Sequence, residues 1–244
     1  MDAIILCGGF AKRLEPITRF IAKPLLPVGG RPLIDYIFDG LDGCGADRII
    51  VSTNSKFADQ FEYWLRIKDG KRHMMIVEPT AHNDEKFGAI RGIAYAIEKA
   101  GIDSDLMVIN GDNFYSLDLK RMVERFKGSG RKPTVALYET DSMESLTKSG
   151  VVALDSEGNI SEFEEKPKIP KSNLLSTGIY LYPRELLGTF KHYLSAGNHP
   201  DAPGYFIQWL IKTEKVAGLK FSGEWYDIGT MESYQELFDK KSRA

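Results

Sequence analysis

Short apolar runs alternate with amphipathic stretches over the first half of the sequence, and this alternation restricts the fold more than any other feature. Four runs are typical of buried strands: 4–6, 49–51, 74–77 and 107–109. Apolar side chains recur at helical spacing in three further stretches, 57–65, 90–97 and 119–126. Strands that alternate with such helices form β-α-β units, so we predict an α/β, Rossmann-like three-layer fold with a mostly parallel, mixed sheet.

The second half has a different pattern. Residues 135–138 and 151–154 are typical of strands, 156–159 of a hairpin turn, and Leu181 and Tyr182 end a further strand. No repeat, low-complexity tract or long linker separates the two halves. We therefore predict one domain over residues 1–244, with a Rossmann-like half at about 1–132 and a half of mixed strands and a C-terminal helix at about 133–244.

The composition argues against several classes of partner. The formal net charge of the 244 residues is −2, which gives no basic surface for nucleic acid or for a membrane. Cys7 and Cys44 form no spaced pair, so we expect reduced thiols in a cytoplasmic protein. No stretch has the length of a membrane span, the N-terminus does not resemble a signal peptide, and the four histidines lack metal-binding spacing.

Ligands of such sheets bind beyond the carboxyl ends of the strands, which selects the loops 7–30, 78–88 and 110–116. The first of these loops joins a glycine pair, Gly8-Gly9, to the cations Lys12, Arg13 and Lys23. A tight turn in a basic surface loop is the simpler interpretation, but glycine N–H groups beside cations favour a phosphate cradle. We expect this loop to face solvent. Neither the dinucleotide fingerprint nor a Walker loop is present.

The stretch GGFAKRLEPIT (8–18), followed by KPLLPV (23–28), resembles the signature of the sugar-phosphate nucleotidylyltransferases, also called nucleotide-sugar pyrophosphorylases. Glucose-1-phosphate thymidylyltransferase is a member of this family. The resemblance continues in order through NGDN (110–113), GVV (150–152), EKP (165–167), TGIY (177–180) and WYDIGT (225–230), and so covers nearly the whole chain. It implies a nucleotidyltransferase (GT-A-like) architecture, with a nucleotide-binding half followed by a sugar-phosphate-binding half.

The sequence also departs from the family pattern. The family usually has G-x-G-T-R where this chain has GFAKR (9–13), and a glutamine in the base-recognition segment is missing from EPTAHNDEKFG (78–88). Many relatives carry a left-handed β-helix extension, and we expect no such domain in this chain.

The resemblance implies a Mg²⁺-dependent transfer that joins a sugar 1-phosphate to a nucleoside triphosphate, with roles for particular residues. The catalytic residues would be Arg13, Lys23 and Asp112, and Mg²⁺ would bind Asp112 and Asp227. The nucleotide would contact Leu6, Gly8, Gly9, Phe10, Ala11, Lys12, Glu78, Gly88 and Gly111. The sugar phosphate would contact Asn113, Gly150, Glu165, Lys166, Thr177, Gly178 and Tyr180.

Simpler interpretations exist for several of these residues. Asp112 fits a turn or a helix cap, Glu165 and Lys166 fit a surface charge pair, and Tyr180 fits a core tyrosine. At the level of function, the alternatives are a non-catalytic nucleotide-sugar sensor on the same fold and a Rossmann-type oxidoreductase. The preferred substrates are glucose 1-phosphate with dTTP or UTP, and mannose 1-phosphate with GTP is second. The oligomeric state stays open, and a homo-oligomer is compatible with the sequence.

Overall fold

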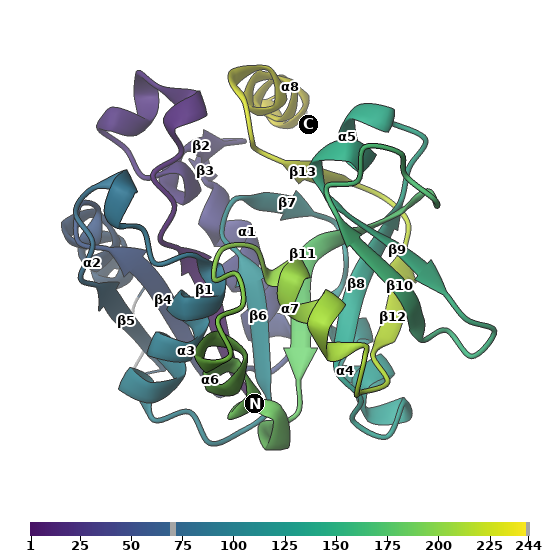
Figure 1. The fold of residues 1–244 in the computed structure, drawn as a ribbon. Coiled ribbons are helices and arrows are strands. Elements are labelled where there is room, and N and C mark those ends of the chain that lie inside the picture. The colour runs from purple at the N-terminus through teal and green to yellow at the C-terminus, as the bar shows by residue number, and fades with distance from the viewer. Residues whose placement is uncertain (69–71, 243–244) are drawn as a thin grey trace.

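A nine-stranded sheet runs through the middle of the protein (Figure 1). The computed structural model describes residues 1–68 and 72–242. The sheet order is β10-β9-β11-β6-β1-β4-β5, with β8 joined to β11 and β12 joined to β8. The strands are β1 (Asp2–Cys7), β4 (Arg48–Asn54), β5 (His73–Glu78), β6 (Leu106–Asn110), β8 (Thr134–Glu139), β9 (Gly150–Leu154), β10 (Ile160–Glu165), β11 (Leu174–Tyr182) and β12 (Ala217–Phe221).

The two halves of the chain differ in strand direction, as the sequence predicts. Strands β6, β1, β4 and β5 are parallel neighbours, and Ile5 pairs with Val51 on one side and with Ile109 on the other. Both faces of these strands are covered, so continuous apolar runs suit them. β11 joins the second half to the first by running antiparallel to β6. β9 and β10 form the predicted hairpin across residues 156–159. The sheet is therefore mixed, and its parallel part lies mainly in the first half.

Helices cover both faces of the sheet, as Figure 1 shows, which completes the predicted three layers. One face packs on α3, α6 and α7, and the other on α1, α2 and α4. The three helices predicted in the first half correspond to α2, α3 and α4, and the predicted C-terminal helix corresponds to α8, whereas α1, α5, α6 and α7 were not predicted. The bounds are α1 (Leu33–Gly43), α2 (Ala58–Ile67), α3 (Ala89–Ala100), α4 (Leu119–Gly128), α5 (Met143–Lys148), α6 (Thr189–Ser195), α7 (Pro203–Leu210) and α8 (Met231–Ser242).

The loop that follows β1 is partly buried, so the expectation that it faces solvent is wrong for its inner side. It forms three short 3₁₀ helices, Lys12–Leu14, Ile17–Arg19 and Lys23–Leu25. Leu14 and Leu26 are almost fully buried because they pack with Phe114 and with Leu237 of α8. The hairpin β2 (Pro27–Val28) and β3 (Arg31–Pro32) follows this loop. The C-terminal helix thus holds the first loop of the chain against the sheet.

Both cysteines are free, in line with the expected reduced thiols. Among the described residues, none of the helices combines the length and the hydropathy that crossing a bilayer requires.

Candidate active site

Lys23 connects two segments at the carboxyl edge of the sheet. Its ammonium group donates to Asp112 Oδ2 at 2.6 Å and to the carbonyl oxygen of Ile228 at 2.7 Å. Asp112 directly follows Gly111 at the end of β6, and Ile228 directly follows β13 (Trp225–Asp227). The Lys23 side chain is only 12% exposed. A buried ammonium group needs such partners, and these two fix its position between the ends of β6 and β13.

The short sheet of β13 and β7 (Asn113–Tyr115) brings the second predicted carboxylate to the first. Asp227 pairs with Asn113 in this sheet, and the Ile228 N–H donates to the Asp112 carbonyl oxygen at 3.2 Å. The Asp227 side chain is exposed to solvent, but the residues around it exclude part of its hydration water. This desolvation, together with the nearby charge of Asp112, raises the pKa of Asp227 to about 6, against the opposing effect of Lys23 and Arg13.

Arg13 lies next to the group formed by Lys23, Asp112 and Asp227. A methyl group added at Gly229 would come within 3.7 Å of Asp227 Oδ2 and 4.0 Å of an Arg13 guanidinium nitrogen, so both groups flank Gly229. Arg13 is exposed, and it makes no ion pair with the rest of the described chain. Its guanidinium is therefore available to a bound anion.

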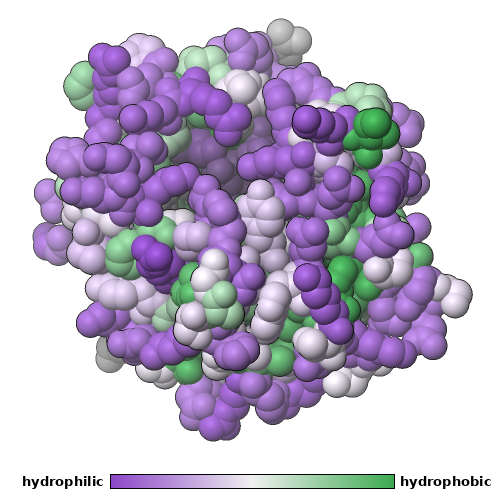
Figure 2. Space-filling model, in the orientation of Figure 1, coloured by the Kyte–Doolittle hydropathy of each residue, from purple (hydrophilic) through white to green (hydrophobic). Residues whose placement is uncertain are grey.

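A pocket of about 870 Å³ opens beside these charged groups. Figure 2 shows the opening as a hollow with hydrophilic residues around it, below α8. Ten residues that the sequence predicts for the site line this pocket: Arg13, Asp112, Asn113, Gly150, Glu165, Lys166, Thr177, Gly178, Tyr180 and Asp227. Every residue predicted to contact the sugar phosphate is among them. The structure thus brings together residues that lie more than 200 positions apart in the sequence.

Glu165 is the most buried carboxylate of the pocket wall, with 8% of its side chain exposed. Its closest cationic group within the described chain is Lys166 Nζ, 3.9 Å from Oε1, and the Lys166 side chain is 60% exposed. Burial raises the pKa of Glu165, while Lys166 opposes this shift. A buried carboxylate with so few partners has free lone pairs. Hydrogen bonds from hydroxyl or ammonium groups of a ligand would stabilise it.

Another part of the pocket wall is made from close contacts with backbone groups. Asn113 Nδ2 donates to the Thr177 carbonyl oxygen at 2.6 Å, and Thr177 Oγ1 donates to the Ala136 carbonyl oxygen at 3.0 Å. Gly178 has a φ of +76°, and a side chain there would collide with Asn113 and with Asn110. Tyr180 is buried, and its hydroxyl bonds Ser176, which fits a core tyrosine whose edge reaches the pocket.

The residues predicted to contact the nucleotide lie outside this pocket, at the carboxyl ends of β1, β5 and β6. A side chain at Gly8 would meet both carboxylate oxygens of Glu78 at 2.9 Å, and one at Gly111 would meet the Leu6 carbonyl oxygen at 2.8 Å. The Glu78 side chain therefore lies beneath the glycine loop and accepts a hydrogen bond from Ser52 at 3.0 Å.

Five other predicted nucleotide contacts are also outside the pocket lining. Gly9 has open space above it and Lys12 is exposed, whereas Phe10 is buried. Ala11 adopts a left-handed conformation with a φ of 47°. Gly88, with a φ of +79°, packs against Pro200. The nucleotide role of all these residues stays a prediction.

The structure adds pocket residues that the sequence analysis did not select. They come from α5, α7, α8 and the end of β6, and include Asn110, Lys148, Gly204, Glu236 and Lys240. Asn110 is the first residue of the motif NGDN and could have been selected there. The charged residues of α5 and α8 have no distinguishing signal, because a charged helix face is usually solvated.

The donor set at Asp112 and Asp227 fits a magnesium ion. Mg²⁺ binds through one or two carboxylates and keeps waters and substrate phosphates as its other ligands. No cluster of three or more histidine, cysteine or acidic side chains suited to a metal occurs in residues 1–68 and 72–242. The pKa of Asp227 is raised first by desolvation and then by the charge of Asp112, and a divalent ion bound between the two carboxylates would remove their repulsion.

Fold and site together define an α/β protein with a group of cations and carboxylates at the carboxyl edge of its sheet, next to a polar pocket. The chain matches the nucleotidyl transferase family model over residues 2–243, and it belongs to this family of sugar-phosphate nucleotidyltransferases. The family resemblance seen in the sequence is thereby confirmed.

Individual relatives support this assignment. The chain is 33% identical over 248 residues to the bifunctional protein GlmU of Methanocaldococcus jannaschii, which covers 98% of this chain and 55% of that protein. It is 31% identical over 252 residues to a glucose-1-phosphate adenylyltransferase of Thermomicrobium roseum, covering 96% of this chain and 58% of that protein. The chain therefore spans little more than half the length of these relatives.

A solved structure has the same fold. The crystal structure of a putative glucose-1-phosphate thymidylyltransferase from Bacillus anthracis, in complex with a sucrose, superposes with a TM-score of 0.88 at 29% sequence identity. The match covers all of this chain and 96% of that one. The predicted nucleotidyltransferase architecture is thus confirmed.

Proposed function

We propose that this protein transfers the nucleotidyl group of a nucleoside triphosphate to a sugar 1-phosphate and releases pyrophosphate. The observation that carries the proposal is the meeting of Arg13 and Lys23 with Asp112 and Asp227 beside a polar pocket. Two polyanions must approach each other in this reaction, so the cations have to neutralise charge and hold the reactants in place. A non-catalytic sensor has no need of this combination.

In the proposed reaction, a phosphate oxygen of the sugar phosphate forms a bond to the α-phosphorus. The bond from that phosphorus to the bridging oxygen breaks, and pyrophosphate leaves with the electron pair. Arg13, which is exposed and has no ion pair within the described chain, binds the leaving pyrophosphate. Lys23 neutralises charge at the α-phosphate. Asp112 and Asp227 would hold Mg²⁺, which supplies Lewis-acid polarisation of the phosphate oxygens when bound.

The sugar phosphate occupies the 870 Å³ pocket in this proposal. Lys166 lies at the pocket wall with an exposed ammonium group, which suits the sugar phosphate group. Glu165 accepts hydrogen bonds from sugar hydroxyls, because its buried oxygens have free lone pairs. Gly150 and Gly178 let the backbone approach the ring.

Glucose 1-phosphate with dTTP or UTP is the substrate pair that we propose, and mannose 1-phosphate with GTP is the alternative. The test is a matrix of dTTP, UTP, CTP, GTP and ATP against several sugar 1-phosphates, read by pyrophosphate release. Release must require both substrates and must fall sharply in Arg13→Ala. Higher activity with GTP or ATP than with both dTTP and UTP would refute the base preference. Binding without release from any pair would favour the sensor.

A further inference from the structure

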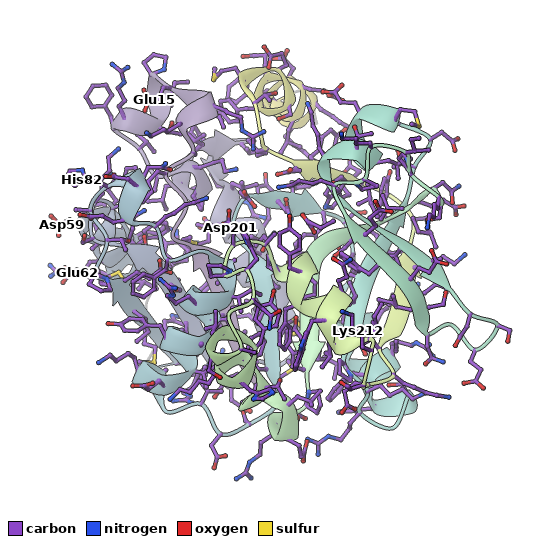
Figure 3. All side chains as sticks on the ribbon, viewed as in Figure 1. Glu15, Asp59, Glu62, His82, Asp201 and Lys212 are labelled. Carbon is purple, nitrogen blue, oxygen red and sulfur yellow. The ribbon has the colours of Figure 1, made fainter. Side chains whose placement is uncertain are left out.

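Segment 200–204, which follows α6 and includes the first two residues of α7, contacts both halves of the protein. Figure 3 shows Asp201 of this segment near the middle of the molecule, in front of the sheet. Residues 202–204 line the pocket, while Pro200 and Asp201 lie against the start of α3. The segment is therefore placed between the loop 79–88 of the nucleotide half and the proposed sugar-phosphate pocket.

On the nucleotide side, segment 200–204 caps α3. The N–H groups of Ala89 and Ile90 donate to the carbonyl oxygens of Asp201 and Pro200 at 2.7 and 2.9 Å. The first N–H groups of a helix lack partners within the helix, so these bonds satisfy them and fasten the segment to α3. Lys86 adds an ion pair to Asp201 at 2.8 Å.

Gly88 allows the backbone of segment 200–204 to lie close to the start of α3. A side chain at Gly88 would lie 2.5 Å from the Pro200 carbonyl oxygen and 2.8 Å from the Asp201 Cα, and its φ of +79° disfavours any residue with a Cβ. Both obstacles are backbone atoms, so a substitution there must displace segment 200–204.

On the sugar side, the same segment confines Glu165. A side chain at Gly204 would overlap Glu165 Oε2 and would lie 2.8 Å from a ring carbon of Phe163. On the other side, a side chain at Gly150 would lie 3.1 Å from the same carboxylate oxygen. The Glu165 carboxylate is thus held between two glycines, and α7, which begins at Pro203, packs on β10 behind it.

We propose that segment 200–204 is a positioning element that fixes the Glu165 carboxylate relative to the nucleotide half, with Gly88 and Gly204 as its two positioning residues. The inference rests on the proposed sugar-phosphate role of the pocket. It assigns Gly88 an effect on the sugar phosphate through the segment, in addition to its predicted contact with the nucleotide. A displaced carboxylate loses hydroxyl hydrogen bonds while the phosphate-binding cations stay in place.

The test is a pair of double-mutant cycles with Glu165→Ala, read by steady-state pyrophosphate release. We expect Gly88→Ala and Gly204→Ala each to raise the KM for the sugar 1-phosphate about tenfold or more, and Gly204→Ala to change the KM for the triphosphate less than about twofold. In the Glu165→Ala background, each glycine substitution should have almost no further effect, because the group it displaces is gone. Gly128→Ala, at the end of α4 with open space around its Cα, is the matched control.

Additive effects, or a Gly88→Ala effect confined to the triphosphate KM, would overturn the inference and leave the proposed function intact. If Gly88→Ala does not fold, Lys86→Met tests the same contact by removing only the ion pair with Asp201. A second readout is independent of turnover: the ¹³C resonance of the Glu165 carboxyl should shift in Gly88→Ala or Lys86→Met and not in Gly128→Ala. An unchanged resonance in both would also overturn it. Wild-type protein that released no pyrophosphate from any substrate pair would instead refute the proposed function, and the resonance would still decide the positioning role.

Discussion

The ammonium nitrogen of Lys23 lies 2.6 Å from Oδ2 of Asp112, although the two residues are 89 positions apart. One residue is a proposed phosphate ligand and the other a proposed metal ligand. An ammonium group at this distance neutralises the carboxylate and repels a divalent cation that approaches the same oxygen. In the proposed site, Lys23 would therefore compete with a metal ion for Asp112.

The first prediction follows from this competition. Lys23→Met should lower the Kd for Mg²⁺ in the absence of nucleotide by about tenfold, which corresponds to about 1.4 kcal/mol. The same variant should lose roughly a hundredfold in turnover, because a charge that stabilises the phosphates is missing. Calorimetry with MgCl₂ measures the first effect. Lys12→Met removes an exposed cation of the same loop and should leave Mg²⁺ binding unchanged. Weaker Mg²⁺ binding in Lys23→Met would show that Lys23 supports the metal site instead.

The second prediction concerns Arg13. Because its side chain is exposed and has no ion pair within the described chain, Arg13→Ala should change the free energy of unfolding by less than about 0.5 kcal/mol. Turnover should nevertheless fall roughly a hundredfold. Arg19→Ala is the control, since Arg19 is an exposed arginine of the same loop that pairs with Glu15. Similar turnover in the two variants would remove Arg13 from the catalytic residues.

Local patterns predicted those parts of the fold that repeat a simple period. Helices α2, α3 and α4 have one apolar face, and β1, β4, β5 and β6 are continuous apolar runs. Helix α7 was missed because Pro203–Leu210 is apolar on most sides, which removes the helical period from its sequence. The motifs likewise located the pocket residues of the strands, whose backbone is fixed by the sheet.

The sequence did not predict the contacts between residues that lie far apart in the chain. Nothing local indicates that Lys23 bonds the Ile228 carbonyl oxygen, or that Glu236 and Lys240 of α8 line the pocket. Such contacts depend on how α8 packs on the opening loop through Leu14 and Leu237. The same packing half-buries the loop. The sequence could not predict this, because it does not show which residue a leucine in a glycine-rich loop contacts.

The third prediction concerns the metal. Removal of divalent ions with EDTA should abolish pyrophosphate release, and added Mg²⁺ should restore it. Asp112→Asn and Asp227→Asn should each require much more Mg²⁺ for the same rate, because each removes one carboxylate from the pair. Asp239→Asn on α8 replaces an exposed carboxylate and serves as the control. Full activity of the EDTA-treated wild-type protein would refute the metal role.

The last prediction concerns Glu78, whose carboxylate is 6% exposed between Gly8 and Gly92. Burial raises the pKa of Glu78 above its ordinary value, and the hydrogen bond from Ser52 only partly opposes this. The folded state therefore holds a proton that the unfolded state releases, so the protein loses stability as the pH rises from about 4.5 through the folded-state pKa. Glu78→Gln removes the ionised form and keeps an oxygen that can accept the Ser52 bond.

Glu78→Gln should thus be more stable than wild type at pH 8, and the difference should vanish at pH 4. Urea denaturation at both pH values measures this, with Glu124→Gln on α4 as the control for losing one exposed negative charge. A variant less stable than wild type at pH 8 would contradict the burial argument. The same variant also tests the base-recognition role of Glu78. Because its carboxylate is buried beneath Gly8, the order of preference among triphosphates should be unchanged. A changed order would mean that the carboxylate reaches the base through the gap that Gly8 and Gly92 leave, so that one buried group both supports the loop and reads the nucleotide.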